Sequence, residues 1–247
     1  MNFFSLFKRR IIYYLKKKYS VDQDYFPSAN LDYLLNHYGS DKAHIFAKTN
    51  NTGHGFSNFY EEQLKNWKDR EIKILEIGSF AGASAAAFVK YFNKAKVFCF
   101  DVNISNFKYD SKNIEVFGID INNTKKIIDI LRKIFNNHNF ENFDLIIDDG
   151  SHQLSDILYS LKFFFKYLKR DGIFVIEDYK HPNYYKLNND IDHILVDELL
   201  NNLKEKRNFK SSLFTNDDQL YLFGKIRKIE TYEGNLNDSN ICFIKKS

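Results

Sequence analysis

The chain has 247 residues, of which 44% are hydrophobic and 28% charged, and its formal net charge is +4 at pH 7. This composition excludes a disordered chain, and the length suits one large α/β domain or a domain with an appendage. Because the net charge is small and no basic face carries stacking aromatics, we expect no nucleic-acid partner. Cys99 and Cys242 lie far apart inside apolar runs, which favours buried free thiols and a cytoplasmic location.

The first 19 residues are predicted to form a basic amphipathic helix. Phe7, Ile11 and Leu15 recur at helical spacing among lysines and arginines. Charges interrupt the apolar residues, so the segment does not resemble a signal peptide, and no run reaches the roughly 20 residues that span a bilayer. Two interpretations remain open. Residues 1–19 make a peripheral contact with an anionic membrane at its inner surface, or they pack on the domain or on a second subunit.

From about residue 72, short apolar runs alternate with helical patterns. Strands are expected at 72–78, 96–102, 114–120, 143–149, 172–178, 225–232 and 240–246, and helices at 84–92, 124–135, 155–168 and 189–206. Asp217 and Asp218 are predicted to lie in a loop.

This alternation predicts an α/β fold with a doubly wound, Rossmann-like, mostly parallel seven-stranded sheet and an antiparallel terminal strand. A helical N-terminal segment precedes the sheet. We expect residues 1–69 to form the amphipathic helix and a segment that covers the cofactor or acceptor, and residues 70–247 to form the main domain.

Ligands bind doubly wound sheets at the carboxyl ends of the strands, so the residues that follow each strand carry the functional signal. Glu76, Gly78 and Gly82 form an E-x-G-x-x-x-G pattern after the first strand. It differs from the dinucleotide loop and disfavours NAD, while its glycines let a ligand approach the backbone. Asp101 follows about 20 residues later and is placed to bind ribose hydroxyls. Asp120 ends the third strand, near the expected position of an adenine amino group.

Carboxylates also follow the fourth and fifth strands. Asp148, Asp149 and His152 come after the fourth, and Glu177 and Asp178 come after the fifth. Acids at so many consecutive strand ends are rare by chance. A polar turn or a helix-capping histidine remains the alternative interpretation of the stretch 146–156.

As a set, these residues resemble the class I S-adenosylmethionine-dependent methyltransferases over about residues 70–247. The segments Tyr38-Gly39-Ser40-Asp41-Lys42 and His54-Gly55-Phe56-Ser57-Asn58-Phe59-Tyr60-Glu61 are similar to the N-terminal signature of the macrolide-sugar O-methyltransferases. The resemblance implies that S-adenosylmethionine binds at the strand ends. The expected cofactor-binding residues are Glu76, Gly78, Ser79, Gly82, Ser84, Asp101, Asp120 and Asp148.

The same resemblance implies that Asp149, Glu177 and Asp178 hold Mg²⁺ and that His152 is the catalytic base beside Asp149. A hard divalent cation on carboxylate oxygens can bind sugar hydroxyls and lower their pKa, and a histidine can take the departing proton. The expected acceptor is a hydroxyl of a sugar or sugar-containing molecule, destined for a surface polysaccharide or a secondary metabolite. We also expect a homo-oligomer.

Four further residues are candidates for acceptor contact, namely Lys42, His54, Tyr60 and His181. Their alternative interpretation is an ordinary polar-aromatic surface. Two other functions stay open for the chain. One is methyl transfer to a nitrogen or phosphoramidate-type acceptor without a metal, and the other is a non-catalytic, membrane-associated scaffold that binds the cofactor.

Overall fold

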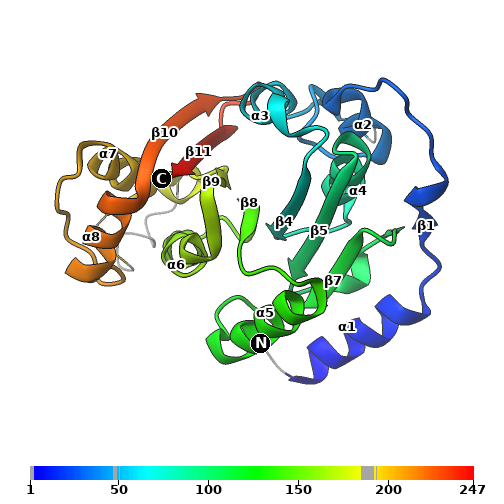
Figure 1. Cartoon of the computed structure of the whole chain (residues 1–247), viewed down its shortest axis with the longest axis horizontal. Coiled ribbons are helices and arrows are strands. Elements are labelled where there is room, and N and C mark those ends of the chain that lie inside the picture. Colours follow the sequence, from blue (N-terminus) through cyan, green and yellow to red (C-terminus); the bar gives the residue numbers. More distant parts are fainter. Residues whose placement is uncertain (1–2, 47–48, 50, 185–191, 193) are drawn as a thin grey trace.

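The computed structural model of the protein has a seven-stranded sheet at its centre (Figure 1). The structure describes residues 3–46, 49, 51–184, 192 and 194–247. The order of strands across the sheet is β10-β11-β9-β8-β4-β5-β7. The bounds of these strands in chain order are β4 Glu71–Ile77, β5 Lys94–Asp101, β7 Ile114–Gly118, β8 Phe143–Asp148, β9 Leu168–Glu177, β10 Ile226–Glu233 and β11 Asn240–Lys246.

Five neighbouring strands of this sheet run parallel, from β7 to β9, and the last strand of the chain closes the fold in the opposite direction. β11 pairs antiparallel with both β9 and β10. The predicted mostly parallel, seven-stranded sheet is therefore confirmed. All five parallel strands end at the same edge, which brings their following loops together.

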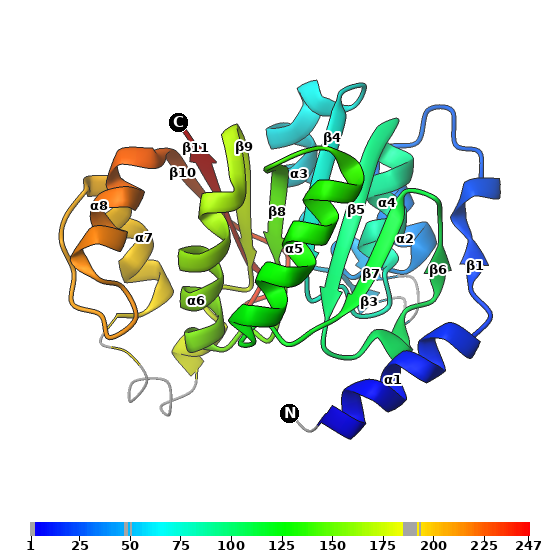
Figure 2. The same ribbon diagram turned by 60° about the horizontal axis from the view of Figure 1, so that its bottom comes forward.

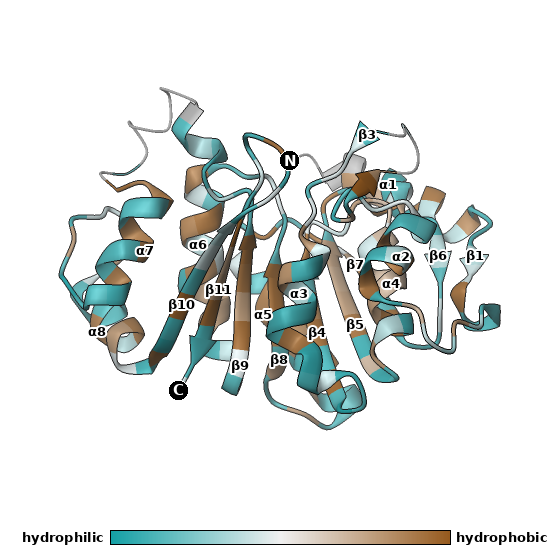
Figure 3. Ribbon diagram, turned by 90° about the horizontal axis from the view of Figure 1, so that it is seen from above, coloured by the Kyte–Doolittle hydropathy of each residue, from teal (hydrophilic) through white to brown (hydrophobic). Residues whose placement is uncertain are grey.

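Helices cover both faces of the sheet, as Figure 2 shows. Side chains of one face of β4, such as Leu75 and Ile77, join a core with the helices α5, α6 and α7, whereas Ile72 and Ile74 join a core with α2, α3 and α4. This alternation has the two-residue period of a strand buried on both sides, and Figure 3 shows the hydrophobic centre of the sheet. The helix bounds are α1 Phe3–Leu15, α2 Leu31–Tyr38, α3 Ser57–Leu64, α4 Ala83–Tyr91, α5 Thr124–His138, α6 Leu154–Phe164, α7 Val196–Glu205 and α8 Asn216–Lys225.

The N-terminal segment packs on the sheet and shares its core. Phe56 and Tyr60 are fully buried in the same cluster as α4. Within the described residues, no helix has the length and apolar character that crossing a bilayer requires. Four short strands complete the segment's contacts: β1 Tyr19–Ser20 pairs with β6 Tyr109–Asp110, and β2 Ile45–Phe46 pairs with β3 Asn51–Thr52.

Two predictions near the C-terminus need comment. The helix expected over 189–206 begins at Val196 in the structure, and residues 189–191 and 193 lie outside the described part of the chain. The loop predicted at Asp217 and Asp218 is wrong, because both residues lie in the first turn of α8. Thr215 and Asp218 form a capping box there: the Thr215 side chain accepts from the Asp218 N–H, and the Asp218 carboxylate accepts from the Thr215 N–H. Acids in the first turn favour the start of a helix. The segment is rich in polar residues, however, so its composition is also that of a loop.

Replacing Thr215 with alanine should destabilise the protein by about 1 kcal/mol, because the first turn of α8 loses its side-chain cap. Thr215→Ser keeps the hydroxyl and is the matched control, with an expected loss much smaller than that of Thr215→Ala. Denaturant unfolding of both variants measures the difference. Equal stability of the two would show that the capping box does not stabilise α8.

Candidate active site

The loop after β4 makes direct backbone contact with the loop after β8. Gly78 has a φ of 86°, and a Cβ placed on it would lie 1.9 Å from the carbonyl oxygen of Asp149. The Asp149 N–H donates to the Ile77 carbonyl at 2.9 Å, and the Gly78 N–H donates to the Phe100 carbonyl at 2.8 Å. Only glycine fits this position, since a side chain would separate the two loops. The predicted cofactor loop and the Asp149 loop are thus held together.

Asp101 lies at the junction of two neighbouring cavities. Its carboxylate accepts from the Phe80 N–H at 2.7 Å and from the Asn103 N–H at 2.5 Å, which fixes the Gly78–Gly82 loop against the end of β5. The second cavity, about 170 Å³ in volume, has Asp120 at its edge and Phe100, Ile119 and Ile121 among its apolar walls. Asp101 and Asp156 also line this cavity, and an apolar slot bordered by a few acids suits a planar base with polar edges.

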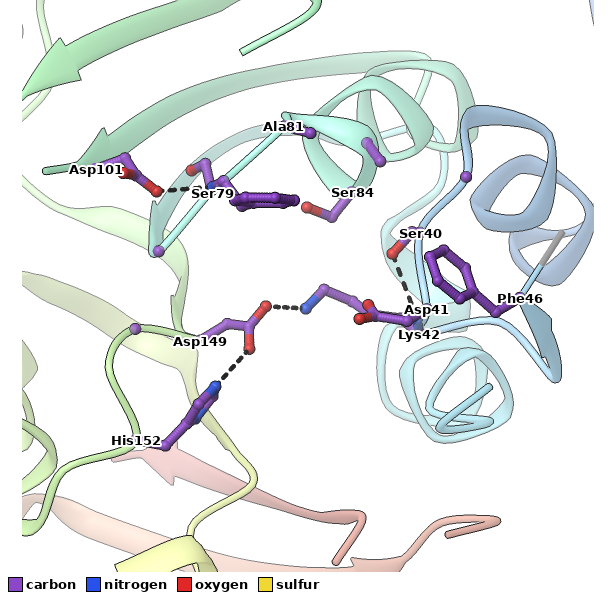
Figure 4. Close-up of a pocket in the computed structure, with 15 residues that line it drawn as sticks. Ser40, Asp41, Lys42, Phe46, Ser79, Ala81, Ser84, Asp101, Asp149 and His152 are labelled. Atoms are coloured by element: carbon purple, nitrogen blue, oxygen red, sulfur yellow. Dashed lines mark hydrogen bonds and ion pairs between the residues drawn. The ribbon is translucent and has the colours of Figure 1, made fainter. Parts of the chain in front are cut away.

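The first cavity, about 360 Å³ in volume, lies between the β4 loop and the N-terminal segment (Figure 4). Gly78, Ser79 and Ser84 border it on one side, as predicted for cofactor-binding residues, and Asp149 and His152 border it on another. Lys42 lies opposite them. The structure therefore brings the predicted cofactor loop, the predicted base and one predicted acceptor residue to a single cavity.

Two of the predicted cofactor acids lie behind the cavities and do not line them. Glu76 is fully buried and accepts from the Ser84 hydroxyl, and no hydrogen bond to a described residue satisfies its Oε2. Burial raises the pKa of Glu76. Asp148 is also buried, with its Oδ2 unsatisfied among the described residues, and burial raises its pKa to about 7. Their contact with a cofactor stays a prediction.

The ammonium of Lys42 lies between the carboxylates of two different residues, Asp149 and Glu177. It forms ion pairs with Asp149 and with Glu177, the latter at 2.5 Å, and the Tyr60 hydroxyl donates to the other Glu177 oxygen at 2.5 Å. The Lys42 side chain is 3% exposed. Burial opposes the charge of Lys42, but the carboxylates of Asp149 and Glu177 outweigh burial and hold its pKa well above the usual value. Glu177 is therefore already paired on both oxygens.

Two other groups, His152 and Asp178, converge on Asp149 beside this ion pair. One ligand atom each from Asp149, His152 and Asp178 lies within 4.8 Å of the others, which is close enough for a shared metal ion. His152 Nε2 is 3.7 Å from Asp149 Oδ1, and burial lowers the pKa of His152, so the imidazole is neutral near pH 7. Burial, and then the charge of Asp149, raises the pKa of Asp178 to about 7. No hydrogen bond to a described residue satisfies the buried Oδ1 of Asp178.

The backbone at this convergence is unusual. His152 has a φ of 55° and Asp178 a φ of 50°, both in the left-handed region that non-glycine residues rarely adopt. Such strain costs about 1–3 kcal/mol per residue and gathers at functional sites. Both residues, which follow different strands, thus combine a left-handed backbone conformation with a side chain close to Asp149.

The remaining predicted acceptor residues border the same group of acids. His54 Nδ1 lies 3.6 Å from Asp178 Oδ1 and 2.7 Å from the Ser239 hydroxyl. His181 Nδ1 lies 3.3 Å from the His152 carbonyl oxygen. Tyr60, in contrast, is fully buried and reaches only the inner side of the site through Glu177.

Sequence reasoning missed Phe46 and Phe80 of the first cavity, and it noted Ser40 and Asp41 only as part of the N-terminal signature, without a role at the site. Phe80 is 64% exposed and has a φ of 41°, so an aromatic ring is held open to solvent on a strained loop residue. Its place between Gly78 and Gly82 was the available signal, because an apolar residue in a ligand loop has no core to join.

Comparison with known proteins shows what the central part of the chain resembles. Residues 75–179 match the family described as a methyltransferase domain. Over these residues the chain is similar to a methyltransferase domain, and the sheet order and the strand-end loops agree with the fold predicted for the class I methyltransferases. The predicted resemblance to this class is confirmed.

Among curated relatives are two sugar O-methyltransferases. The L-olivosyl-oleandolide 3-O-methyltransferase of Streptomyces antibioticus is 31% identical over 160 residues, which are 60% of this chain and 36% of that protein. The mycinamicin VI 2''-O-methyltransferase of Micromonospora griseorubida is 24% identical over 132 residues, which are 51% of this chain and 31% of that protein. The matched regions thus span about a third of the curated relatives.

A solved structure of the mycinamicin-pathway methyltransferase MycE, in complex with Mg and S-adenosylhomocysteine, shares the fold. Its TM-score to this chain is 0.66 at 19% sequence identity, over 89% of this chain and 55% of MycE.

Asp148→Asn should stabilise the protein more at high pH than at low pH. The folded state holds the Asp148 proton up to about pH 7, while the unfolded chain releases it near 3.8. The proton's contribution to the free energy of unfolding is therefore complete below about pH 4 and disappears as the pH rises toward 7. Asparagine stays neutral, so the variant should gain about 1–4 kcal/mol over the native protein between about pH 4 and pH 8.

Denaturant unfolding across that pH range measures this gain, with Asp110→Asn as an exposed control that should show no such trend. A stability difference between Asp148→Asn and the native protein that does not vary with pH would contradict the buried, protonated state of Asp148.

Proposed function

We propose that this chain is an S-adenosylmethionine-dependent O-methyltransferase that acts, with a divalent metal ion, on a hydroxyl of a sugar or sugar-containing acceptor. The observation that carries the proposal is the convergence of Asp149, His152 and Asp178, of which Asp149 and His152 border the cavity beside the loop after β4. The sugar O-methyltransferases among the relatives support the same acceptor class.

The two adjoining cavities support the cofactor assignment. Both are lined by Gly78, Asp101 and Gly150, so a single ligand can extend through them. The apolar second cavity, with Asp120, suits the adenine, and Asp101 at the junction suits the ribose. The methionine part then reaches the first cavity, beside Asp149 and His152.

The residues beside the cavity also fit a metal ion. Asp178 presents a buried carboxylate oxygen that lacks a hydrogen-bond donor among the described residues, and Asp149 offers a second carboxylate oxygen within 4.8 Å of a carboxylate oxygen of Asp178. His152 lies beside both carboxylates and is not needed as a ligand. Oxygen-rich groups favour Mg²⁺ or another hard divalent cation. Such a cation, when bound, supplies Lewis acidity that lowers the pKa of acceptor hydroxyls.

His152 is the proposed base. Its neutral imidazole borders the cavity and can accept a proton from an acceptor hydroxyl during attack on the methyl group. Asp149 orients the imidazole and stabilises the resulting positive charge across the 3.7 Å separation. Asp101 and the loop backbone hold the cofactor, so that the methyl group faces the acceptor in line.

Glu177 has a different relation to the site from Asp178. Its two oxygens accept from Lys42 and Tyr60, so Glu177 can act as the predicted third metal ligand only when the Lys42 ammonium moves away. This observation favours a second candidate function, methyl transfer to a nitrogen or phosphoramidate-type acceptor without a metal. In that reaction the ammonium of Lys42 balances the charges of Asp149 and Glu177, and a metal ion is not required.

His152→Asn and Asp149→Asn should each lower methyl transfer by about 10²- to 10⁴-fold, because they remove the base and the group that orients it. The assay offers S-adenosylmethionine with a labelled methyl group together with nucleotide sugars, glycosides and mycinamicin VI, and counts label in the acceptor. Cofactor binding, measured by calorimetry, should change little in His152→Asn.

Glu71→Gln is the matched control, because this carboxylate side chain is 72% exposed and lies at the opposite end of β4 from the site. Full turnover by both site variants would show that neither residue takes part in the reaction.

Removal of divalent cations with a chelator should lower the methyl-transfer rate by about 100-fold or more, and added Mg²⁺ should restore it. Direct titration with Mn²⁺ gives a second measurement that needs no acceptor. Asp178→Asn should weaken Mn²⁺ binding at least about tenfold, since it replaces an ionised ligand by an amide. An unchanged rate after chelation, with no Mn²⁺ binding, would instead select the metal-independent reaction.

A further inference from the structure

Helix α1 turns its apolar side chains to solvent. Phe7, Ile11, Tyr14 and Leu15 lie on one side of the helix and are 55%, 44%, 76% and 82% exposed, respectively. Figures 1 and 2 show α1 at the margin of the molecule, beside β7. A run of large apolar side chains on one exposed helix face marks an interaction surface. We refer to these four residues, with Ile12 and Lys8, as the outer face of α1.

The opposite side of α1 attaches to the domain through its cations. Arg9 donates to the Val102 carbonyl at 2.9 Å, and Arg10 donates to the Gly118 carbonyl at 3.0 Å. Lys16 donates to the Ser105 carbonyl at 3.1 Å. These contacts fix which side of the helix faces outward, and they reverse the usual arrangement, in which a surface helix buries its apolar side.

Charge decides which partner fits the outer face. Residues 1–20 contain six lysines and arginines and no acid. A two-fold contact with a second copy would place the same patch against itself, so that Lys8 and its like charges would face each other. An anionic bilayer instead accepts apolar side chains at its interface and attracts every lysine around them.

We propose that the outer face of α1 docks on an anionic lipid bilayer, with its apolar side chains in the interfacial region and Lys8 and Lys17 near the headgroups. Both lysines are exposed. The proposal concerns attachment to lipid and does not depend on the reaction proposed above.

Docking would also orient the domain. Val102, whose carbonyl accepts from Arg9, lines the second cavity, and Gly118, which accepts from Arg10, ends the neighbouring strand β7. The helix is therefore attached at the carboxyl edge of the sheet, where the cavities open. Attachment through α1 would bring that edge, and not the opposite one, toward the membrane.

Vesicle binding of the full chain tests the proposal. The probes are vesicles of phosphatidylcholine with phosphatidylglycerol and vesicles of phosphatidylcholine alone, separated by sedimentation. We expect binding to the anionic vesicles and weakening by added salt. Ile11→Ser combined with Leu15→Ser should abolish binding, whereas Leu220→Ser, at a 63% exposed leucine of α8, should not.

A charge-reversal pair completes the design. Lys8→Glu with Lys17→Glu should weaken binding to anionic vesicles by about fivefold or more per lysine, while Lys133→Glu with Lys210→Glu changes the net charge equally but leaves α1 intact. If the two pairs weakened binding equally, net charge and not the outer face of α1 would determine binding to the vesicles, and the proposal would be overturned.

Three further outcomes would also overturn it. One is the absence of binding to either vesicle by the native chain. Another is binding that survives Ile11→Ser with Leu15→Ser. The third is a dimer in light scattering that these two substitutions dissociate, without lipid binding, because the outer face would then bind a second copy. Cofactor binding and circular dichroism of each variant establish that it is folded.

Discussion

The arrangement at the carboxyl edge of the sheet depends on the buried ammonium of Lys42. This one side chain joins the N-terminal segment to Asp149, which follows β8, and to Glu177, which ends β9. Charges this deep in a protein are tolerated only when they are paired, and removing one partner leaves a costly unpaired charge. The ion pair therefore fixes how the N-terminal segment closes over the sheet, and it sets the wall of the larger cavity.

Burial separates carboxylates that the sequence presents as equivalent. Asp101 and Asp120 border the cavities and make local hydrogen bonds to backbone N–H groups. Glu76, Asp148 and Glu177 have side chains buried behind or beneath them. The same residue type at the same position in successive βα units thus takes on two kinds of task. The half-buried acids at the cavities can meet a ligand, while the fully buried acids organise the protein around it.

The sequence was sufficient to predict the sheet, because four of the parallel strands are buried along most of their length and leave continuous apolar runs that few other structures require. The convergence of Asp149 and His152 was also predictable, since both follow one strand at the ligand-binding edge. The position of Lys42 between Asp149 and Glu177 was not predictable, because it depends on contacts over more than a hundred residues of sequence. The helix at Asp217 was missed for a local reason: a capping box made of polar residues resembles a loop in composition.

The side of α1 that faces the domain was equally hidden. Its periodicity indicated an amphipathic helix but not which side would attach, and that side is decided by carbonyl groups at the ends of β5 and β7 that only the folded sheet brings together.

The contact between Gly78 and the Asp149 carbonyl has a thermodynamic consequence. No side chain fits between these two backbones, so neither loop can shift without displacing the other. A molecule that displaces the Gly78 loop when it binds would therefore change the free energy of whatever binds near Asp149. By linkage, the second ligand must alter the affinity for the first by the same factor. Because Gly78 has no Cβ, the two backbones touch, and binding at one loop and binding at the other would be linked reciprocally.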